Sequence, residues 1–412
     1  MEQFSDVVIK KKKMLILICG VIIFFLTSMA KVIIPSTIFQ DLLKMGMSVD
    51  KISSLGAAFL YSYAASQLLM GCFSDRYGGV RILLIGGSLF AGGTILFPLM
   101  KHYPLMILFR IITGFGAGTI FLGVAKLLGD LFSKRFGFAL GAVLFFGYLG
   151  PTTGTVPMVK LVEAIGWRNA MILPGAVALL PMLLIVAMMK GTIKPVTGGQ
   201  TFTPLFCMLK SRSMWFLCFS CASVYGAYYA IVGQIGQKTL TDLFSLSSGR
   251  AATCIMILTL IVAVNNMGGN LMLKLFHERR KMVLLCGVTL SLLGIIIAMY
   301  GFSAGKGITF FLTSMVMLAF PAGYFPMFSI VAKEINPPEY IAMSVAFLNF
   351  MAFVFISLYQ NITGCILHAF PPETGTLAFS QAAYAAVYLF FLIGAVISLI
   401  AVCFVPETRN SR

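Results

Sequence analysis

Apolar runs of about 20 residues recur along the whole chain, and short polar segments that hold most of the charges separate them. A helix needs about 20 apolar residues to cross the hydrocarbon core of a bilayer. The runs do not alternate apolar and polar positions, as the strands of a membrane β-barrel do. The pattern therefore predicts an all-α membrane protein.

We expect twelve transmembrane helices in two six-helix halves. The predicted spans cover residues 14–36, 52–74, 82–100, 104–130, 137–160, 169–190, 213–237, 251–275, 282–301, 307–332, 341–366 and 383–405. The longest connection is rich in glycine and proline, which is typical of a linker. It divides the chain into an N-terminal half over 1–190, a cytoplasmic linker over 191–212 and a C-terminal half over 213–412.

Composition and charge support this interpretation. Only 10% of the 412 residues are charged, against about 25% in soluble domains. The net charge of +17 does not indicate a nucleic-acid partner, because the basic residues lie in short clusters between apolar runs and never form one face. With the N-terminus inside, 19 Lys and Arg lie in cytoplasmic segments and 8 in outer ones. This bias predicts a multi-pass protein of the inner membrane with both termini in the cytoplasm.

The apolar runs contain no pair of carboxylates and no nucleophile–base set, so we expect no catalytic residue and no enzyme. No Cys/His set has the spacing of a metal site, and we expect neither a metal nor another cofactor. The expected surroundings are the lipid bilayer and a small-molecule substrate, and we expect a monomer.

The loop after the second span carries the most specific motif, Gly71-Cys-Phe-Ser-Asp75-Arg76-Tyr-Gly78-Gly79-Val80-Arg81. It resembles the signature loop of the major facilitator superfamily, G-x-x-x-D-R-x-G-R-[RK]. This resemblance extends over the whole chain and implies the major facilitator fold. It also implies a gating role for Asp75, Arg76, Gly78 and Arg81.

Two further motifs resemble the same superfamily. The fourth span carries Arg110-x-x-x-Gly114-x-Gly116, and a charged side chain at membrane depth usually faces the bundle interior; the alternative is an arginine that reaches outward to the interface. The fifth span carries Gly150-Pro151, which partly resembles a stretch typical of antiporters. The alternative is a Gly/Pro kink that lets this helix bend during gating.

Lys31 lies in the first span, some forty residues before Asp75. Organophosphate antiporters and the related anion:cation symporters carry a basic residue at a similar place, where it binds the substrate anion. The alternative is a lysine that reaches the outer interface by its long stem. Other polar residues could complete a binding cavity or form helix–helix contacts: Tyr63, Tyr228, Asn265, Tyr324, Asn349 and Tyr359.

The sequence thus predicts a secondary transporter that moves a small organic anion by alternating access, with Lys31 and Arg110 supplying positive charge. The anion-handling families that the chain resembles often carry a second basic residue in the seventh span, which here has no charge before Lys238. We therefore expect a carboxylate-type metabolite rather than a phosphate ester. Two alternatives remain: an exporter of drugs or metabolites that works as an antiporter, and a transporter-like membrane sensor.

Overall fold

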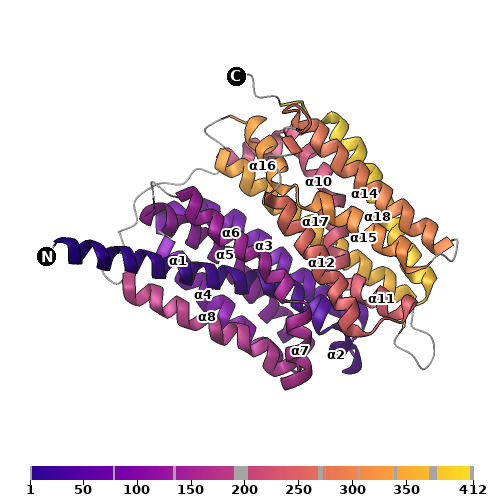
Figure 1. The fold of residues 1–412 in the computed structure, drawn as a ribbon, viewed down its shortest axis with the longest axis horizontal. Helices are drawn as coiled ribbons and strands as arrows, with labels where there is room; N and C mark the ends of the chain where they lie inside the picture. Colours follow the sequence, from indigo (N-terminus) through magenta and orange to yellow (C-terminus); the bar gives the residue numbers. More distant parts are fainter. Residues whose placement is uncertain are drawn as a thin grey trace. The chain divides into compact units, whose positions relative to one another are not determined.

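The computed structural model describes residues 2–77, 79–132, 136–189, 203–267, 272–273, 275–303, 307–337, 341–370 and 378–408. Only the backbone is described at 2–10, 35–36, 70–77, 126, 129–130, 136–142, 144, 148, 203–204, 267 and 341–342. Nearly all of the described residues are helical, and none of them lies in a strand (Figure 1).

Backbone contacts divide the chain into two compact units. The first consists of Met1–Lys31 and Ala58–Thr201, and the second of Val32–Ala57 and Phe202–Arg412. The short stretch Val32–Ala57 therefore groups with the C-terminal part of the chain, although it lies early in the sequence.

The first unit holds most of α1 and α3 together with four other long helices and two short ones. Its helices are α1 (Glu2–Val32, up to Lys31), α3 (Val49–Tyr77, from Ala58), α4 (Gly79–Leu96), η2 (Phe97–Leu99), α5 (Tyr103–Leu131), α6 (Phe136–Thr153), α7 (Val156–Ile165) and α8 (Trp167–Met189). Helix α4 packs extensively against α5, and α8 also packs against α4 (Figure 1).

The second unit begins with three pieces of the early chain: η1 (Ile33–Thr37), α2 (Phe39–Lys44) and the first turns of α3. Its later helices are α9 (Thr203–Lys210), α10 (Arg212–Ala230), η4 (Ile231–Ile235), α11 (Gly236–Phe244), α12 (Ser248–Met267), α14 (Arg280–Ser303), α15 (Ile308–Ala322), α16 (Phe325–Glu334), α17 (Ile341–Ala369) and α18 (Gln381–Phe404). Helix α10 packs against both α17 and α18, and α14 packs against α15 and α18.

Ten helical segments in the described residues are long and apolar enough to cross a membrane. They are Lys11–Val32, Gly79–Leu99, Tyr103–Ala125, Trp167–Met189, Arg212–Phe244, Ser248–Asn266, Arg280–Ser303, Ile308–Glu334, Met343–Ala369 and Gln381–Phe404. The two other predicted spans, 52–74 and 137–160, coincide with α3 and with α6 followed by α7. Helices therefore occur at all twelve predicted positions.

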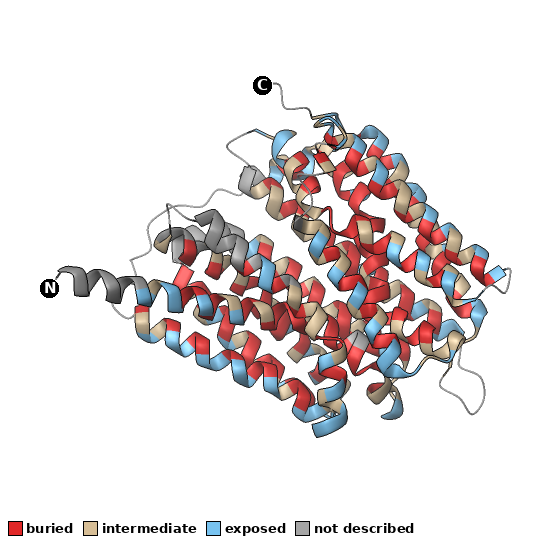
Figure 2. Cartoon of the chain, viewed as in Figure 1, coloured by how far each residue is buried: buried red, intermediate tan, exposed pale blue. Residues whose placement is uncertain are grey.

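Many of the apolar residues on the outer faces of these helices are exposed (Figure 2). On α8, Leu180 is 65% and Leu183 is 60% exposed, while Ala170 and Ile185 on other faces are buried. Large exposed apolar surface is unfavourable in water. It is what a helix presents to the acyl chains of lipid.

Within the described residues, four of the predicted spans are interrupted. The first and the seventh pass into the π-helical segments η1 and η4, the fifth breaks between α6 and α7, and the tenth breaks between α15 and α16. Pro151, Pro321 and Pro35 lie at or next to three of these interruptions, where the missing N–H weakens the helix. Such interruptions need internal hydrogen-bond partners at membrane depth, and they often mark functional sites.

Some element boundaries differ from those we expect. Helix α1 begins at Glu2 rather than near residue 14, because lysine is a good helix former and the basic tail continues the helix. Helix α9 forms inside the segment expected to be a linker, whose other residues lie mostly outside the described part of the chain. Helix α17 extends to Ala369, so His368 lies in its last turn and not in a loop.

Candidate functional site

Lys31 lies in the last turn of α1, directly before the π-helical segment η1. Its ammonium nitrogen is 4.2 Å from the ring centroid of Tyr63 and 6.0 Å from that of Phe24. The Tyr63 phenol oxygen accepts a hydrogen bond of 2.9 Å from Gln67 Nε2. Lys31 is partly exposed, whereas the Tyr63 and Gln67 side chains are buried. The structure therefore brings the predicted residues Lys31 and Tyr63 together.

Arg110 lies on α5, with its guanidinium carbon 4.5 Å from the Phe59 centroid and 5.8 Å from that of Phe97. It is 1% exposed. A cation over an aromatic face gains about 1–2 kcal/mol when both are shielded from water. These contacts and its burial keep the charge in the interior, in agreement with an inward-facing arginine rather than one that reaches the interface.

The two cations are connected by a pair of aromatic rings. Phe59 and Tyr63 lie one turn apart on α3, and their rings stack with centroids 6.2 Å apart and an interplanar angle of 17°. Arg110 contacts the first ring and Lys31 the second. In this row Lys31 is partly exposed, whereas Arg110 is buried.

The glycines that follow Arg110 let neighbouring helices approach α5 closely. A Cβ on Gly114 would collide with the Phe59 carbonyl oxygen and the Ser62 hydroxyl of α3. A Cβ on Gly116 would lie 2.5 Å from the Gly86 carbonyl oxygen of α4. Small residues at such positions are typical of helix contacts in membranes.

Among the predicted gating residues, Gly150 packs against α1. A Cβ at Gly150 would lie 2.6 Å from the Phe25 carbonyl oxygen and 2.8 Å from the Met29 nitrogen. Pro151 follows it inside α6, which ends two residues later at Thr153. Both interpretations of this motif, an antiporter signature and a kink, are compatible with that break.

The other gating predictions fall near the start of α4. Arg81 lies in its first turn and is partly exposed. Gly78 and the side chains of Asp75 and Arg76 lie outside the described residues.

The predicted binding residues of the second unit are distributed over several helices and are mostly in contact with their neighbours. The centroid of the Tyr359 ring lies 4.8 Å from that of Phe390 and 5.8 Å from that of Phe391, both on α18. Tyr359 is 4% exposed. Asn265 Nδ2 donates a 3.0 Å hydrogen bond to the Phe320 carbonyl oxygen, which joins α12 to α15.

Three further candidates complete this group. Tyr324 lies at the break between α15 and α16, and its ring centroid is 5.7 Å from that of Phe320. Tyr228 is buried next to Tyr229 on α10. Asn349 is partly exposed on α17. A role in binding stays a prediction for all five residues of the second unit.

Within the second unit, the early residues of α3 make polar contacts that the sequence does not indicate. Gln234 of η4 donates to the Ser53 hydroxyl, and the Ser54 hydroxyl donates to Asn361 Oδ1 at 3.1 Å. The π-helical segments η1 and η4 also contact one another. Serine and glutamine are too common in any sequence for this pairing to be recognised without the structure.

A buried ion pair is a second feature that sequence reasoning misses. Lys238 Nζ lies 2.5 Å from Asp242 Oδ1 on α11, and both side chains are 5% exposed. The other carboxylate oxygen accepts from the Tyr384 phenol at 2.8 Å and from the Phe379 backbone N–H at 2.9 Å. The i,i+4 spacing of the pair is the signal that could have indicated it.

The Major Facilitator Superfamily model matches residues 16–358 of the chain. The chain belongs to the Major Facilitator Superfamily. The fold is accordingly the all-α, twelve-helix fold of this family, and its members are transporters rather than enzymes. The predicted fold class is confirmed.

Solved structures agree in fold. A bacterial homologue of the human lysosomal transporter Spinster aligns with a TM-score of 0.78 and 16% identity, covering 95% of this chain and 97% of that one. The nucleoside transporter NupG aligns with a TM-score of 0.73 and 16% identity, over 95% and 99% of the two chains.

Curated relatives match only part of the chain. The probable sulfoacetate transporter SauU of Cupriavidus necator is 29% identical over 33% of this chain and 32% of its own length. The 4-hydroxybenzoate transporter PcaK of Acinetobacter baylyi is 25% identical over 41% and 37%. The quinolone resistance protein NorA of Staphylococcus aureus is 25% identical over 49% and 50%. The matches thus span a third to a half of the length of these relatives.

Proposed function

We propose that this chain transports a small organic anion of the carboxylate or sulfonate type across the inner membrane by alternating access, as a monomer with both termini in the cytoplasm. The observation that carries the proposal is the partly exposed ammonium of Lys31 at the face of Tyr63. A cation kept at membrane depth costs about 3 kcal/mol. An anionic substrate would offset that cost each time it binds.

The aromatic row explains how Lys31 is kept in place between transport cycles. The Tyr63 ring stabilises the ammonium when no anion is present, and Gln67 fixes the phenol at the other end of that ring. A carboxylate or sulfonate that approaches from the exposed side forms a charge-assisted hydrogen bond with Lys31 without displacing the ring. Arg110 adds positive potential from behind Phe59.

The names of two relatives support an anionic substrate, since sulfoacetate and 4-hydroxybenzoate both carry negative charge. The seventh span has no charge before Lys238, which favours a carboxylate or sulfonate over a phosphate ester. The relative named for quinolone resistance supports the alternative of drug export. A membrane sensor, the third possibility, would bind its ligand without net flux.

Uptake into proteoliposomes separates these possibilities. The panel contains sulfoacetate, 4-hydroxybenzoate, glycerol 3-phosphate and a quinolone, each offered with and without internal substrate. We expect flux of at least one carboxylate or sulfonate and not of the quinolone. Binding without flux would favour the sensor, and flux of the quinolone alone would favour the exporter.

Lys31→Met tests the site itself, because methionine keeps the length of the side chain and removes the charge. A hydrogen bond to a charged group contributes about 1.5–3 kcal/mol, so KM should rise about 10- to 150-fold. Lys160→Met on α7 is the matched control, since that lysine is exposed. Tyr63→Phe, which keeps the aromatic face, should lose far less than Tyr63→Leu. Unchanged transport in Lys31→Met would overturn the proposed site.

A further inference from the structure

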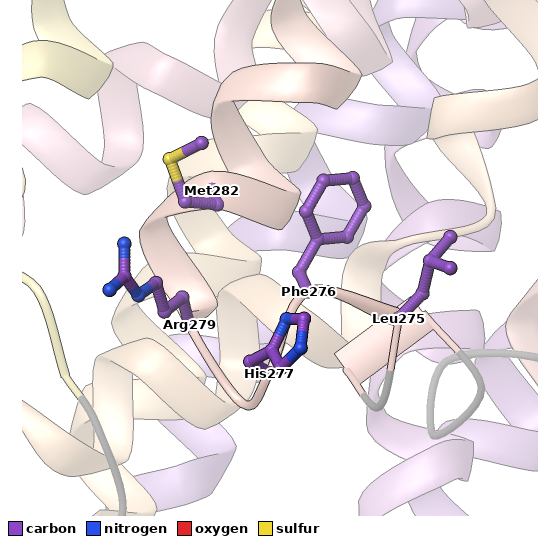
Figure 3. A pocket seen from close by; sticks show the side chains of 5 residues that line it. All are labelled: Leu275, Phe276, His277, Arg279 and Met282. Atoms are coloured by element: carbon purple, nitrogen blue, oxygen red, sulfur yellow. The ribbon is translucent and has the colours of Figure 1, made fainter.

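A hollow of about 480 Å³ lies at the connection between α12 and α14 (Figure 3). Its lining combines apolar and polar side chains: Leu275, Phe276 and Met282 with His277 and Arg279. Leu275 is 65% and Met282 is 38% exposed. The hollow is therefore amphipathic and open to its surroundings.

The backbone of this connection makes a left-handed turn. His277 and Glu278 have φ values of 53° and 62°, an uncommon conformation for residues other than glycine. The turn is held by the Glu278 N–H, which donates to the Leu273 carbonyl at 2.8 Å, and the Arg279 N–H, which donates to the Phe276 carbonyl at 3.1 Å. Strained backbone of this kind persists where the surrounding contacts determine it.

The turn places the charges of the loop in different directions. Arg280 points inward, where its Nη1 lies 3.1 Å from Glu278 Oε2 and its Nε lies 3.4 Å from Glu334 Oε1. The carboxylate of Glu278 is thus engaged by Arg280. Lys281 Nζ donates to the Cys403 carbonyl at 2.6 Å.

Arg279 lines the hollow, and in the described part of the chain no carboxylate pairs with it. Its guanidinium is exposed, and His277 offers a ring N–H in the same lining. The hollow therefore has a net positive charge at its polar side.

The position of the hollow matches the edge of a bilayer. The segment of α14 that is long and apolar enough to span a membrane begins at Arg280, and that of α12 ends at Asn266, which puts residues 275–282 at the ends of these spans. At this depth an exposed Leu275 and Met282 contact acyl chains, while Arg279 reaches the level of the phosphates.

We propose that this hollow binds one anionic phospholipid. The phosphodiester accepts hydrogen bonds from the Arg279 guanidinium, which has the fork geometry that phosphate oxygens fit. One acyl chain lies along Leu275, Phe276 and Met282. A zwitterionic lipid brings a positive group to the same place, so charge complementarity selects the anionic headgroup. The site does not depend on the substrate of the transporter.

The experiment uses the full-length protein, purified in mild detergent and delipidated, and measures retained lipid by native mass spectrometry after addition of phosphatidylglycerol or phosphatidylcholine. We expect one tightly retained phosphatidylglycerol and about tenfold less phosphatidylcholine. Arg279→Gln should reduce retention of the anionic lipid about tenfold or more. Arg212→Gln is the matched control, because Arg212 is an exposed arginine at the start of α10 outside the hollow.

A second variant separates a lipid from a soluble anion. Leu275→Ser removes apolar contact and leaves Arg279 intact, so it should also weaken lipid retention several-fold. Equal retention of the two lipids, or full retention in Arg279→Gln, would overturn the proposal. Competition by glycerol 3-phosphate as effective as by the lipid, with no effect of Leu275→Ser, would show a soluble phosphate site instead and would equally overturn it.

Discussion

Gly116→Ala should destabilise the first unit, because Gly116 lies where α5 and α4 are closest. A Cβ at this position would lie 2.5 Å from the Gly86 carbonyl oxygen and 3.0 Å from the Leu89 carbonyl carbon. Ordinary Cβ contacts begin near 3.4 Å. The Phe90 backbone nitrogen is closer still, and these atoms belong to backbone and cannot rotate away, so the helices would have to separate by up to about 1 Å.

Gly92→Ala on α4 is the matched control, since nothing lies within 4 Å of a Cβ at Gly92. Both substitutions gain about 1 kcal/mol of helix propensity, and this gain cancels when the two variants are compared. The difference is then the cost of overpacking, about 1–3 kcal/mol. At about 2–4 °C per kcal/mol for a domain of this size, Gly116→Ala should melt about 2–12 °C below Gly92→Ala.

The measurement is the apparent Tm of each purified variant in one detergent. Each sample is heated, and the remaining size-exclusion peak reports how much protein is still folded. Gly92→Ala should melt at or slightly above the unsubstituted protein. If Gly116→Ala melts as high as Gly92→Ala, the close approach of α4 and α5 is not what the structure describes, and the packing role of the motif fails.

Two other substitutions test features outside the aromatic row. Asp242→Ala leaves Lys238 and Tyr384 buried without their shared acceptor and should lower the free energy of unfolding by about 3–5 kcal/mol, which is measured as a large drop in Tm. Asp242→Asn retains an acceptor and should lower Tm less. Equal Tm values for both variants would argue against a buried ion pair. Asp75→Asn should strongly slow transport while the protein still elutes as a folded species, and normal flux would remove Asp75 from the gate.

The fold could be predicted from the sequence because membrane insertion depends on length and apolarity, which are properties of each segment alone. The interruptions were harder to predict. Pro35 and Pro151 indicate breaks by their chemistry, but η4 contains no proline, and its π-helical form depends on packing inside the second unit. Local sequence does not contain that information.

The candidate site was predicted in part. Lys31 and Arg110 stand out as cations in apolar runs, but the sequence leaves open whether they face lipid, solvent or protein. The intervening Phe59 was missed. Its spacing of one turn from Tyr63, and of Tyr63 from Gln67, places all three on one face of α3, and this periodicity is the signal that could have found it.

The same spacing connects the glycine motif to the proposed site. Gly114 and Gly118 lie one turn apart on α5, and each contacts the backbone of one residue of the aromatic row: Gly114 the Phe59 carbonyl and Gly118 the Tyr63 carbonyl, the latter at 2.5 Å from a Cβ at Gly118. The close approach of α5 to α3 therefore determines the positions of the Phe59 and Tyr63 rings. Because the Lys31 ammonium lies over the Tyr63 ring, it also determines the position of that ammonium.

Gly118→Ala and Gly116→Ala should consequently differ in their effect on transport. Both overpack α5, but Gly118→Ala pushes on α3 at Tyr63, whereas Gly116→Ala pushes on α4. Since a displacement of Tyr63 moves the face on which the Lys31 ammonium rests, Gly118→Ala should raise KM for the anion by several-fold, while Gly116→Ala lowers Tm with little change in KM. Proteoliposome uptake at a temperature well below both Tm values measures this. An equal change of KM in the two variants would mean that the motif acts on general packing alone and that the row on α3 does not position Lys31.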